Sequence, residues 1–218
     1  LKKSPLPFTT STLQQDASSK LNFAPQKTMR IAQQLYEGVN IKGQGTVGLI
    51  TYLRTDSTRI SVEADAAAKE YIKEAYGAEF VGAGTVAKKD DKKVQDAHEA
   101  IRPTYMTNSP ASIKDELSRD QFRLYQLIWN RFMASRMAPA KYENTSVKIA
   151  AGDYRFNASA SKIAFDGFLS VYNINNEKSE GNVMLKSIDE DTKLTLNNLE
   201  PKQHFTQPPA HYTEASLV

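Results

Sequence analysis

The stretch Gly48–Thr58 holds the most reactive pair of side chains in the sequence, a tyrosine and an arginine two residues apart. Residues 47–53 are rich in β-branched and large apolar side chains, which predicts a short strand that ends near Arg54. Side chains alternate between the two faces of a strand. We therefore expect the phenol of Tyr52 and the guanidinium of Arg54 to point the same way, ahead of a polar turn at 55–58.

The pair formed by Tyr52 and Arg54 suits an attack on a phosphodiester. A phenol ordinarily keeps its proton at neutral pH, because its pKa is about 10. An adjacent cation favours the phenolate, and a guanidinium can bind two phosphate oxygens at once. Tyr52 would then be the nucleophile, and Arg54 would stabilise charge in the transition state. In the alternative interpretation, Tyr52 packs against a neighbouring strand and Arg54 pairs with Asp56.

The segment Asp96–Thr104 holds His98, which is the only histidine among residues 1–141. Acidic neighbours favour its protonated form. A protonated imidazole can donate to a phosphate oxygen or pass a proton to a leaving group. The alternative is a histidine that only caps a helix or faces solvent. We assign no chemistry to His204 and His211.

The composition excludes several other kinds of site. The 218 residues include no cysteine, which excludes disulfides, thiol nucleophiles and cysteine-bound metals. The mean hydropathy of −0.53 and the lack of a long uncharged apolar stretch argue against a membrane span or a membrane partner.

The charge is unevenly distributed along the chain. Residues 1–141 carry 21 basic and 15 acidic side chains, a net charge of +6, whereas residues 142–218 carry a net charge of −3. A polyanionic partner is therefore expected to meet the first half.

Four helices are expected to position the reactive residues. Capping residues and apolar spacing predict that they begin at Thr12, Pro25, Ser61 and Ser118. Their expected apolar faces include Tyr36 in the second helix and the stripe from Phe122 to Met133 in the fourth, and that stripe is interpreted as core. Residues 82–96 show no apolar period, which indicates an exposed loop.

The sequence pattern changes from helical to strand-like after Pro139. Residues 147–150 and 154–157 flank Gly152-Asp153, which predicts a tight hairpin. Short apolar runs from Val183 to Leu199 predict further antiparallel strands, and a new helix begins near Glu214. We therefore expect an α+β fold, in which a mostly helical module precedes an antiparallel β-rich one. Because the chain starts without Met and stops just inside a predicted helix, we expect a piece of a longer protein.

Several strings of the sequence resemble one family, in order along the whole chain. Ile50–Ser57 resembles the active-site tyrosine motif of type IA DNA topoisomerases, and His98–Thr104 resembles their second signature. Pro7–Gln15 and Thr213–Val218 are further matches. Leu53 stands where topoisomerase III-like members tend to have proline, so the resemblance is to the bacterial topoisomerase I branch.

The resemblance implies roles for individual residues. Tyr52 would form a transient bond to a DNA 5′-phosphate, Arg54 would bind the scissile phosphate, and His98 would act beside the tyrosine. Residues expected to contact DNA are Thr55, Asp56 and Arg102. The enzyme would relax negatively supercoiled DNA by cutting one strand, passing another and rejoining the ends.

The resemblance also implies a division into parts. Residues 1–12 would end a preceding β arch, 13–138 would form the mostly helical domain with the nucleophile, 139–207 would belong to the arch, and 208–218 would start the next helical domain.

The magnesium-binding Toprim domain of the family has no counterpart in this sequence. Asp189-Glu190-Asp191 is a run of three acids, which favours a solvated turn rather than a metal site. We therefore expect Mg²⁺ to be bound only in the full-length enzyme and no metal in this chain, which by itself would be inactive. The expected partners are single-stranded segments of DNA and the remaining domains, in a monomer in the bacterial cytoplasm.

Two non-enzymatic interpretations stay open from the residues alone. In one, the chain is a non-catalytic module that binds single-stranded nucleic acid and stacks Tyr52 on a base. In the other, it is a structural interaction domain that does not bind DNA.

Overall fold

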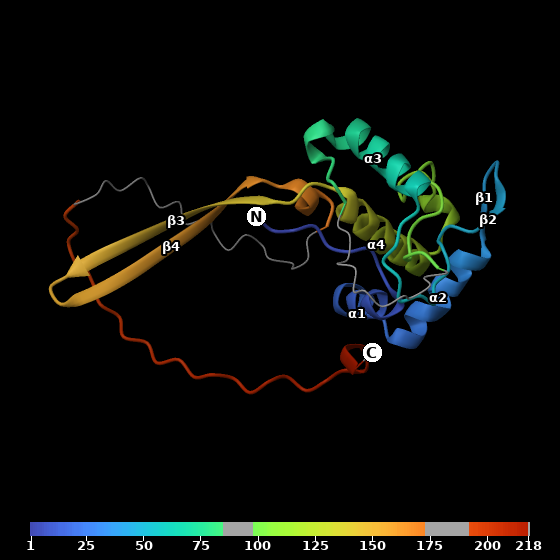
Figure 1. The fold of residues 1–218 in the computed structure, drawn as a ribbon. Coiled ribbons are helices and arrows are strands. Elements are labelled where there is room, and N and C mark those ends of the chain that lie inside the picture. Colours follow the sequence, from blue (N-terminus) through green and yellow to red (C-terminus); the bar gives the residue numbers. More distant parts are fainter. Residues whose placement is uncertain (85–97, 173–191, 218) are drawn as a thin grey trace, which may run out of the picture.

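The computed structural model describes residues 1–84, 98–172 and 192–217. The described residues up to 138, called here the helical body, gather at one end, and a long two-stranded hairpin projects from it (Figure 1). Within these residues there are five α-helices and two small antiparallel sheets, which confirms the expected α+β class. The helices are α1 Thr10–Leu21, α2 Pro25–Glu37, α3 Val62–Tyr76, α4 Arg119–Arg136 and α5 Glu214–Leu217. The strands are β1 Val39–Ile41, β2 Gly45–Val47, β3 Lys141–Ala151 and β4 Tyr154–Phe165, and short 3₁₀ turns lie at Ala78–Phe80, Lys114–Glu116 and Gly167–Ser170.

The helix ends follow local capping chemistry. Ser61 and Ser118 cap α3 and α4 as predicted, Pro25 opens α2, and Gly38 ends it with a φ of +125°. The predicted start of the first helix at Thr12 is wrong, because Thr9 is the N-cap of α1. The Thr12 hydroxyl reaches back to accept from the Thr9 amide at 2.9 Å, so Thr12 closes the capping box and does not open it.

The predicted strand over 47–53 is also wrong. β2 ends at Val47 and pairs only with β1, while Ile50 forms an isolated antiparallel bridge with Pro103. Leu49, Ile50 and Leu53 are all buried, so the strict in–out alternation of a strand fails here. Tyr52 and Arg54 are nevertheless both exposed to solvent.

The core of the helical body is built around α4. Its apolar stripe is buried from Tyr125 to Met133, which confirms the interpretation of this stripe as core, while Phe122 at its edge is only partly buried. The Tyr125 hydroxyl donates to the Asn108 carbonyl at 2.6 Å, and burial raises the pKa of this phenol well above its usual range. Leu49 and Leu53 belong to the same core, which anchors the residues on either side of Tyr52.

The hairpin forms around Gly152 as predicted, with Ala151 opposite Tyr154 and Lys141 opposite Phe165. The further strands predicted up to Leu199 are not found where the structure describes them. Residues 192–213, called here the return segment, contain no strand, because the apolar side chains of this stretch are exposed and meet no sheet. The predicted strand residues before 192, and most of the predicted loop at 82–96, lie outside the described residues.

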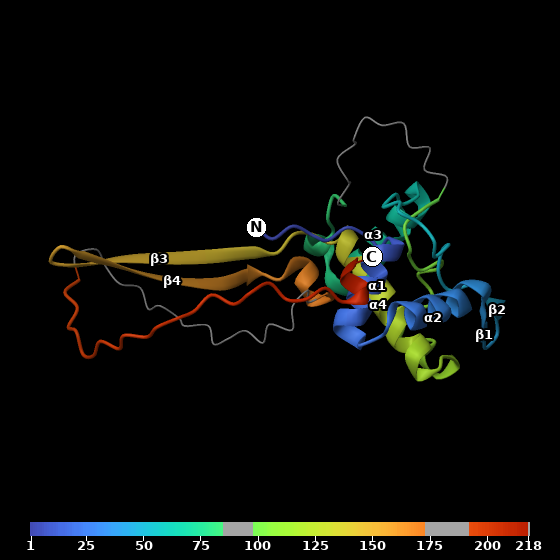
Figure 2. The ribbon, with the colours of Figure 1, turned by 90° about the horizontal axis from the view of Figure 1, so that it is seen from below.

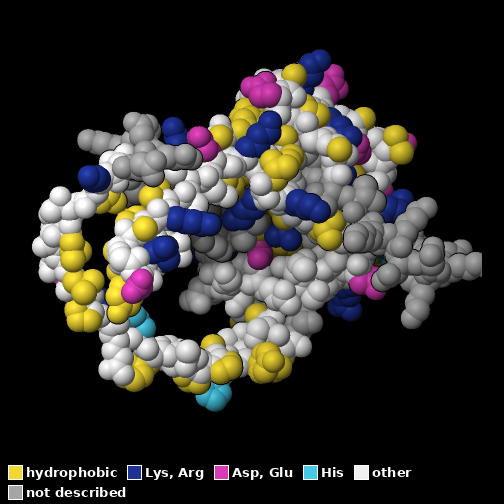
Figure 3. Space-filling view, turned by 60° about the vertical axis from the view of Figure 1, so that its left-hand side comes forward, with side chains coloured by type: hydrophobic (Ala, Val, Ile, Leu, Met, Phe, Trp, Pro, Cys, Tyr) yellow, Lys and Arg dark blue, Asp and Glu magenta, His cyan; other side chains and the backbone are white. Residues whose placement is uncertain are grey.

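The return segment leads back from the hairpin to α5, which contacts α1 (Figures 1 and 2). The helix predicted near Glu214 is therefore confirmed. A space-filling view shows an opening between the return segment and the helical body, and Lys and Arg side chains gather along its upper border (Figure 3).

Candidate active site around Tyr52

Tyr52 lies on residues 48–58, called here the tyrosine segment, which the N-terminus of α1 holds in place. The Thr10 hydroxyl donates to the Leu53 carbonyl at 2.8 Å and accepts from the Thr55 amide at 2.8 Å. The Thr10 amide donates to the Thr55 carbonyl at 2.8 Å. Leu53 and Thr55 are buried and anchor this part of the chain, whereas Tyr52, 37% exposed, and Arg54 lie on the surface.

Residues 98–104, called here the histidine segment, run antiparallel to the tyrosine segment. The Thr51 amide donates to the Arg102 carbonyl at 2.9 Å, and the Thr104 amide donates to the Leu49 carbonyl at 3.1 Å. The Thr51 hydroxyl donates to the Ala100 carbonyl at 2.7 Å and accepts from the Arg102 amide at 3.0 Å. These bonds fix the register between two sequence motifs that lie about fifty residues apart.

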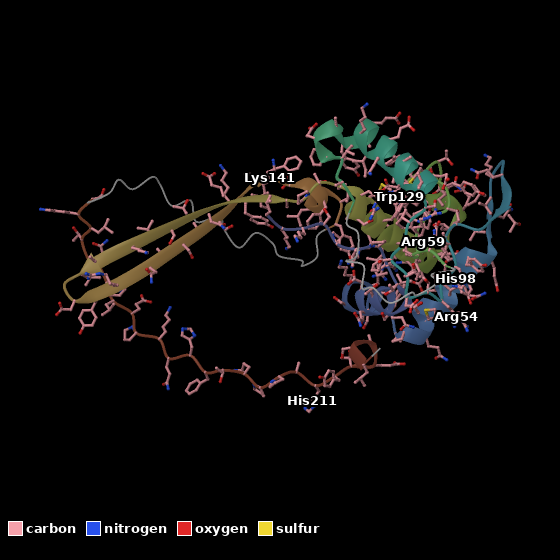
Figure 4. All side chains as sticks on the ribbon, viewed as in Figure 1. Arg54, Arg59, His98, Trp129, Lys141 and His211 are labelled. Atoms are coloured by element: carbon pink, nitrogen blue, oxygen red, sulfur yellow. The ribbon has the colours of Figure 1, made fainter. Side chains whose placement is uncertain are left out.

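That register brings His98 against Tyr52. The centroids of their rings are 5.0 Å apart, with an angle of 32° between the ring planes. The ring of Tyr36, from the last turn of α2, contacts Tyr52 at 5.6 Å and 68°. Tyr52 is therefore bordered by an imidazole and a second phenol. In Figure 4, Arg54 and His98 lie at the end of the helical body away from the hairpin, whereas His211 lies on the return segment.

Arg54 is exposed and forms no hydrogen bond or ion pair with another described residue. Asp56 is exposed too, and no ion pair joins it to Arg54 among the described residues, contrary to the structural alternative for this arginine. A guanidinium that no carboxylate of the described chain neutralises keeps its five donors available for an anion beside Tyr52.

Two of the other expected DNA contacts, Thr55 and Arg102, have partners within the protein. The buried Thr55 hydroxyl accepts from the Ser57 amide at 3.0 Å, which shapes the turn. Arg102 is held by Glu99, with both nitrogen–oxygen distances 2.7 Å, and its side chain is only 13% exposed. A role of Thr55, Asp56 and Arg102 in DNA binding stays a prediction.

Tyr36 is the site residue that the sequence interpretation missed. The spacing placed it on the apolar face of α2, yet its side chain is 40% exposed and meets Tyr52. Gly38 was the available signal, because a helix that stops there leaves Tyr36 in its last turn, where no side chain of a following turn covers it.

The described residues offer no cluster of three His, Asp or Glu side chains that could bind a metal ion. Near the site, Glu99 is engaged by Arg102, so this part of the chain does not fit a magnesium site. The same residues contain no helix long and apolar enough to cross a membrane.

Comparison with known proteins agrees with the resemblance seen in the motifs. A family model described as DNA topoisomerase matches residues 1–218. The fold is similar to that of full-length topoisomerase I from Thermotoga maritima, with 44% sequence identity and a TM-score of 0.72 over 87% of this chain. The match spans 29% of the Thermotoga chain. The signature strings around Tyr52 and His98, the fold and the full-length match together show that this chain belongs to the type IA DNA topoisomerase family.

Proposed function

We propose that this chain supplies the nucleophile for transient cleavage of a single DNA strand in a type IA topoisomerase. The observation that carries the proposal is the exposed Tyr52 phenol, bordered by His98 and followed two residues later by Arg54, which has no ion pair among the described residues. The phenol oxygen would bond to phosphorus, and the bond from phosphorus to the 3′ oxygen would break. The phenol loses its proton, the 3′ oxygen gains one, and the 5′-phosphate stays on Tyr52.

Arg54 and His98 would stabilise the negative charge that develops in this step. A guanidinium binds two phosphate oxygens in a fixed geometry, which suits the negative charge that builds up on the phosphoryl group. His98, in its protonated form, would donate a hydrogen bond beside the reacting phosphate. The reverse attack by the 3′ oxygen reseals the strand, and the phosphotyrosine bond conserves the free energy needed for it.

Relaxation of negatively supercoiled DNA is proposed for the whole enzyme rather than for this chain. Family membership, the net charge of +6 over residues 1–141 and the basic border of the opening support DNA as the partner (Figure 3). Further domains would bind Mg²⁺ and complete the site. We also propose a monomer in the bacterial cytoplasm, where chromosomal DNA lies.

The test uses Tyr52→Phe in the complete protein that carries this chain. A single strand labelled at its 3′ end is incubated with the enzyme, which is then denatured, and the labelled peptide is mapped. We expect the label on Tyr52 in the unaltered enzyme and none in the variant, because phenylalanine lacks the attacking oxygen. DNA affinity should stay within about twofold, since the ring remains.

Tyr105→Phe is the matched control, because Tyr105 is exposed, lies just beyond the histidine segment and should keep full cleavage. A covalent DNA adduct formed by the Tyr52→Phe enzyme would contradict the proposal.

The exposed rings of Tyr52, Tyr36 and His98 also fit a module that only stacks on unpaired bases. That second candidate predicts salt-sensitive binding of single strands with no DNA linkage in any context. A structural interaction domain would show no DNA binding even at low salt.

A further inference from the structure

Tyr36 contacts the proposed nucleophile from an element outside both signature motifs. It lies in the last turn of α2, and its ring meets that of Tyr52 nearly edge to face, at 5.6 Å and 68°. Aromatic pairs favour this geometry, because the positive edge of one ring faces the negative face of the other.

The backbone around Tyr36 is tied directly to the tyrosine segment. The Leu49 amide donates to the Leu35 carbonyl at 2.8 Å, across the end of α2. Gly48 lies so close that a Cβ atom there would be 2.8 Å from the Tyr36 carbonyl oxygen. The Gly38 amide closes the last turn by donating to Gln34 at 3.1 Å. The base of the Tyr36 side chain is therefore fixed relative to the backbone that leads to Tyr52.

A half-exposed tyrosine can adopt several rotamers when nothing restrains its ring. Tyr52 is restrained on one border by His98, with ring planes 32° apart, and on another by Tyr36. Its side chain is partly exposed, and no hydrogen bond to its hydroxyl is found among the described residues. The direction of the phenol oxygen thus depends on ring contacts, of which Tyr36 supplies one.

We propose that Tyr36 is a positioning residue, whose ring holds the Tyr52 phenol in the orientation needed for attack on phosphorus. This inference rests on the proposed function of Tyr52. Orientation matters because a reaction rate depends steeply on how often the attacking atom is aligned with its target. The Tyr36 hydroxyl makes no hydrogen bond with the described residues, so the ring, and not the hydroxyl, performs this role.

The test compares Tyr36→Ala, Tyr36→Leu and Tyr36→Phe in the complete enzyme. Single-turnover cleavage of an end-labelled single strand gives the rate constant at saturating DNA and, separately, the apparent dissociation constant. We expect the alanine and leucine variants to lower the rate constant about tenfold, while the dissociation constant stays within about twofold. Tyr36→Phe should restore the rate to within about twofold, because it keeps the ring edge.

Tyr76→Ala is the matched control for loss of a surface tyrosine. Tyr76 is 38% exposed, near the 40% of Tyr36, and its ring also has one aromatic neighbour, Phe80 at 6.1 Å. It lies at the end of α3 and should leave the cleavage rate unchanged. Alanine and leucine both favour helix, so α2 should persist, and thermal unfolding of each variant checks this.

Three outcomes overturn the inference. In the first, Tyr36→Ala and Tyr36→Leu cleave at the rate of the unaltered enzyme. In the second, Tyr36→Phe is as defective as alanine, which assigns the effect to the hydroxyl. In the third, the cleavage rate constant stays unchanged and only the dissociation constant for DNA rises, which makes Tyr36 a DNA contact. If the unaltered enzyme forms its adduct on Tyr52 and one of these outcomes occurs, only the positioning role fails. If the adduct maps elsewhere, the proposed function fails with it.

Discussion

At the scale of single residues, Arg54 differs from the three arginines that form ion pairs among the described residues. Arg102, Arg131 and Arg136 are largely buried and form ion pairs with Glu99, Asp16 and Asp65. Arg54 is exposed and no carboxylate among the described residues neutralises it. Water solvates an exposed guanidinium, so leaving it without a carboxylate partner costs little free energy. Its attraction to a phosphate becomes stronger once that phosphate displaces the water.

Replacing Arg54 by alanine should therefore slow DNA cleavage by about 10²- to 10³-fold in the complete enzyme, as is typical for loss of one transition-state donor. The measurement is the single-turnover rate of adduct formation on a labelled single strand. Arg59→Ala is the control, because Arg59 is also exposed and lies five residues further along the chain.

Arg59→Ala should change the rate by less than about threefold, since its side chain is not directed to Tyr52 by any contact found in the described residues. Equal losses in the two arginine variants would show that only the general positive charge matters, which contradicts the assignment to Arg54.

At the scale of elements, the site is assembled where three separate pieces of chain meet. The N-terminus of α1 binds the backbone at 53–55, the end of α2 binds Leu49, and the histidine segment binds Thr51. Each piece holds a different part of the tyrosine segment. A loop restrained in this way can present an exposed phenol without losing its conformation.

One carboxylate of α3 pairs with an arginine of α4. Asp65 accepts from Arg136 at 3.0 Å and from Lys69 at 2.6 Å. Burial alone would raise the pKa of Asp65, but the hydrogen bonds from Lys69 and Arg136 outweigh it and lower that pKa. Because the folded pKa lies below the unfolded one, this group stabilises the fold at neutral pH, and the contribution is lost as the pH falls through the folded value.

Asp65→Asn should therefore lower the free energy of unfolding at pH 7 by about 1–2 kcal/mol, because Arg136 loses a charged partner. Urea unfolding followed by circular dichroism measures it. The difference between the variant and the unaltered protein should shrink as the pH falls below about 4, where the carboxylate becomes protonated.

Asp120→Asn is the control for this prediction, because Asp120 pairs with Lys27 at 2.7 Å between two exposed side chains. Asp120→Asn should lower the free energy of unfolding by less than Asp65→Asn does, since solvent screens an exposed pair. A difference for Asp65→Asn that is constant from pH 7 to pH 3 would contradict the assigned cause.

At the scale of the whole molecule, a polar cluster joins the base of the hairpin to the helical body. The Arg131 guanidinium, from α4, donates to the Leu6 carbonyl at 2.6 Å and to the Tyr172 hydroxyl at 3.0 Å. Asp16 of α1 accepts from Lys20 at 3.2 Å and also from the Tyr172 hydroxyl. The chain that enters the body and the chain that leaves the hairpin are thus held together by the side chains of α1 and α4.

The isolated 218-residue chain should not relax negatively supercoiled plasmid DNA in the presence of Mg²⁺. It spans 29% of the Thermotoga enzyme to which it is similar, and its described residues do not fit a metal site. Gel electrophoresis of the plasmid measures relaxation, with the complete enzyme as the positive control. The chain should still bind single strands, with an affinity that falls as salt rises. Efficient relaxation by this chain alone would contradict the prediction.

Local chemistry explains which parts of the fold could be predicted. The ends of α2, α3 and α4 follow from Pro25, Ser61 and Ser118, since caps act within one turn of the chain. The start of α1 was misplaced because Thr9 and Thr12 both suit a cap, and only the hydrogen bonds choose between them. The strand predicted at 47–53 failed because burial of neighbouring residues on both sides overrode alternation.

The sequence by itself determined which residues are candidates for the proposed chemistry. Tyr52, Arg54 and His98 stand out because an attack on a phosphodiester needs certain residue types in short strings, whatever surrounds them. The tertiary structure alone decided that His98 meets Tyr52 at 5.0 Å, that Arg54 has no carboxylate partner among the described residues, and that Tyr36 borders Tyr52. The physical reason is that these relations depend on hydrogen bonds and packing between segments up to about fifty residues apart, which no local pattern encodes.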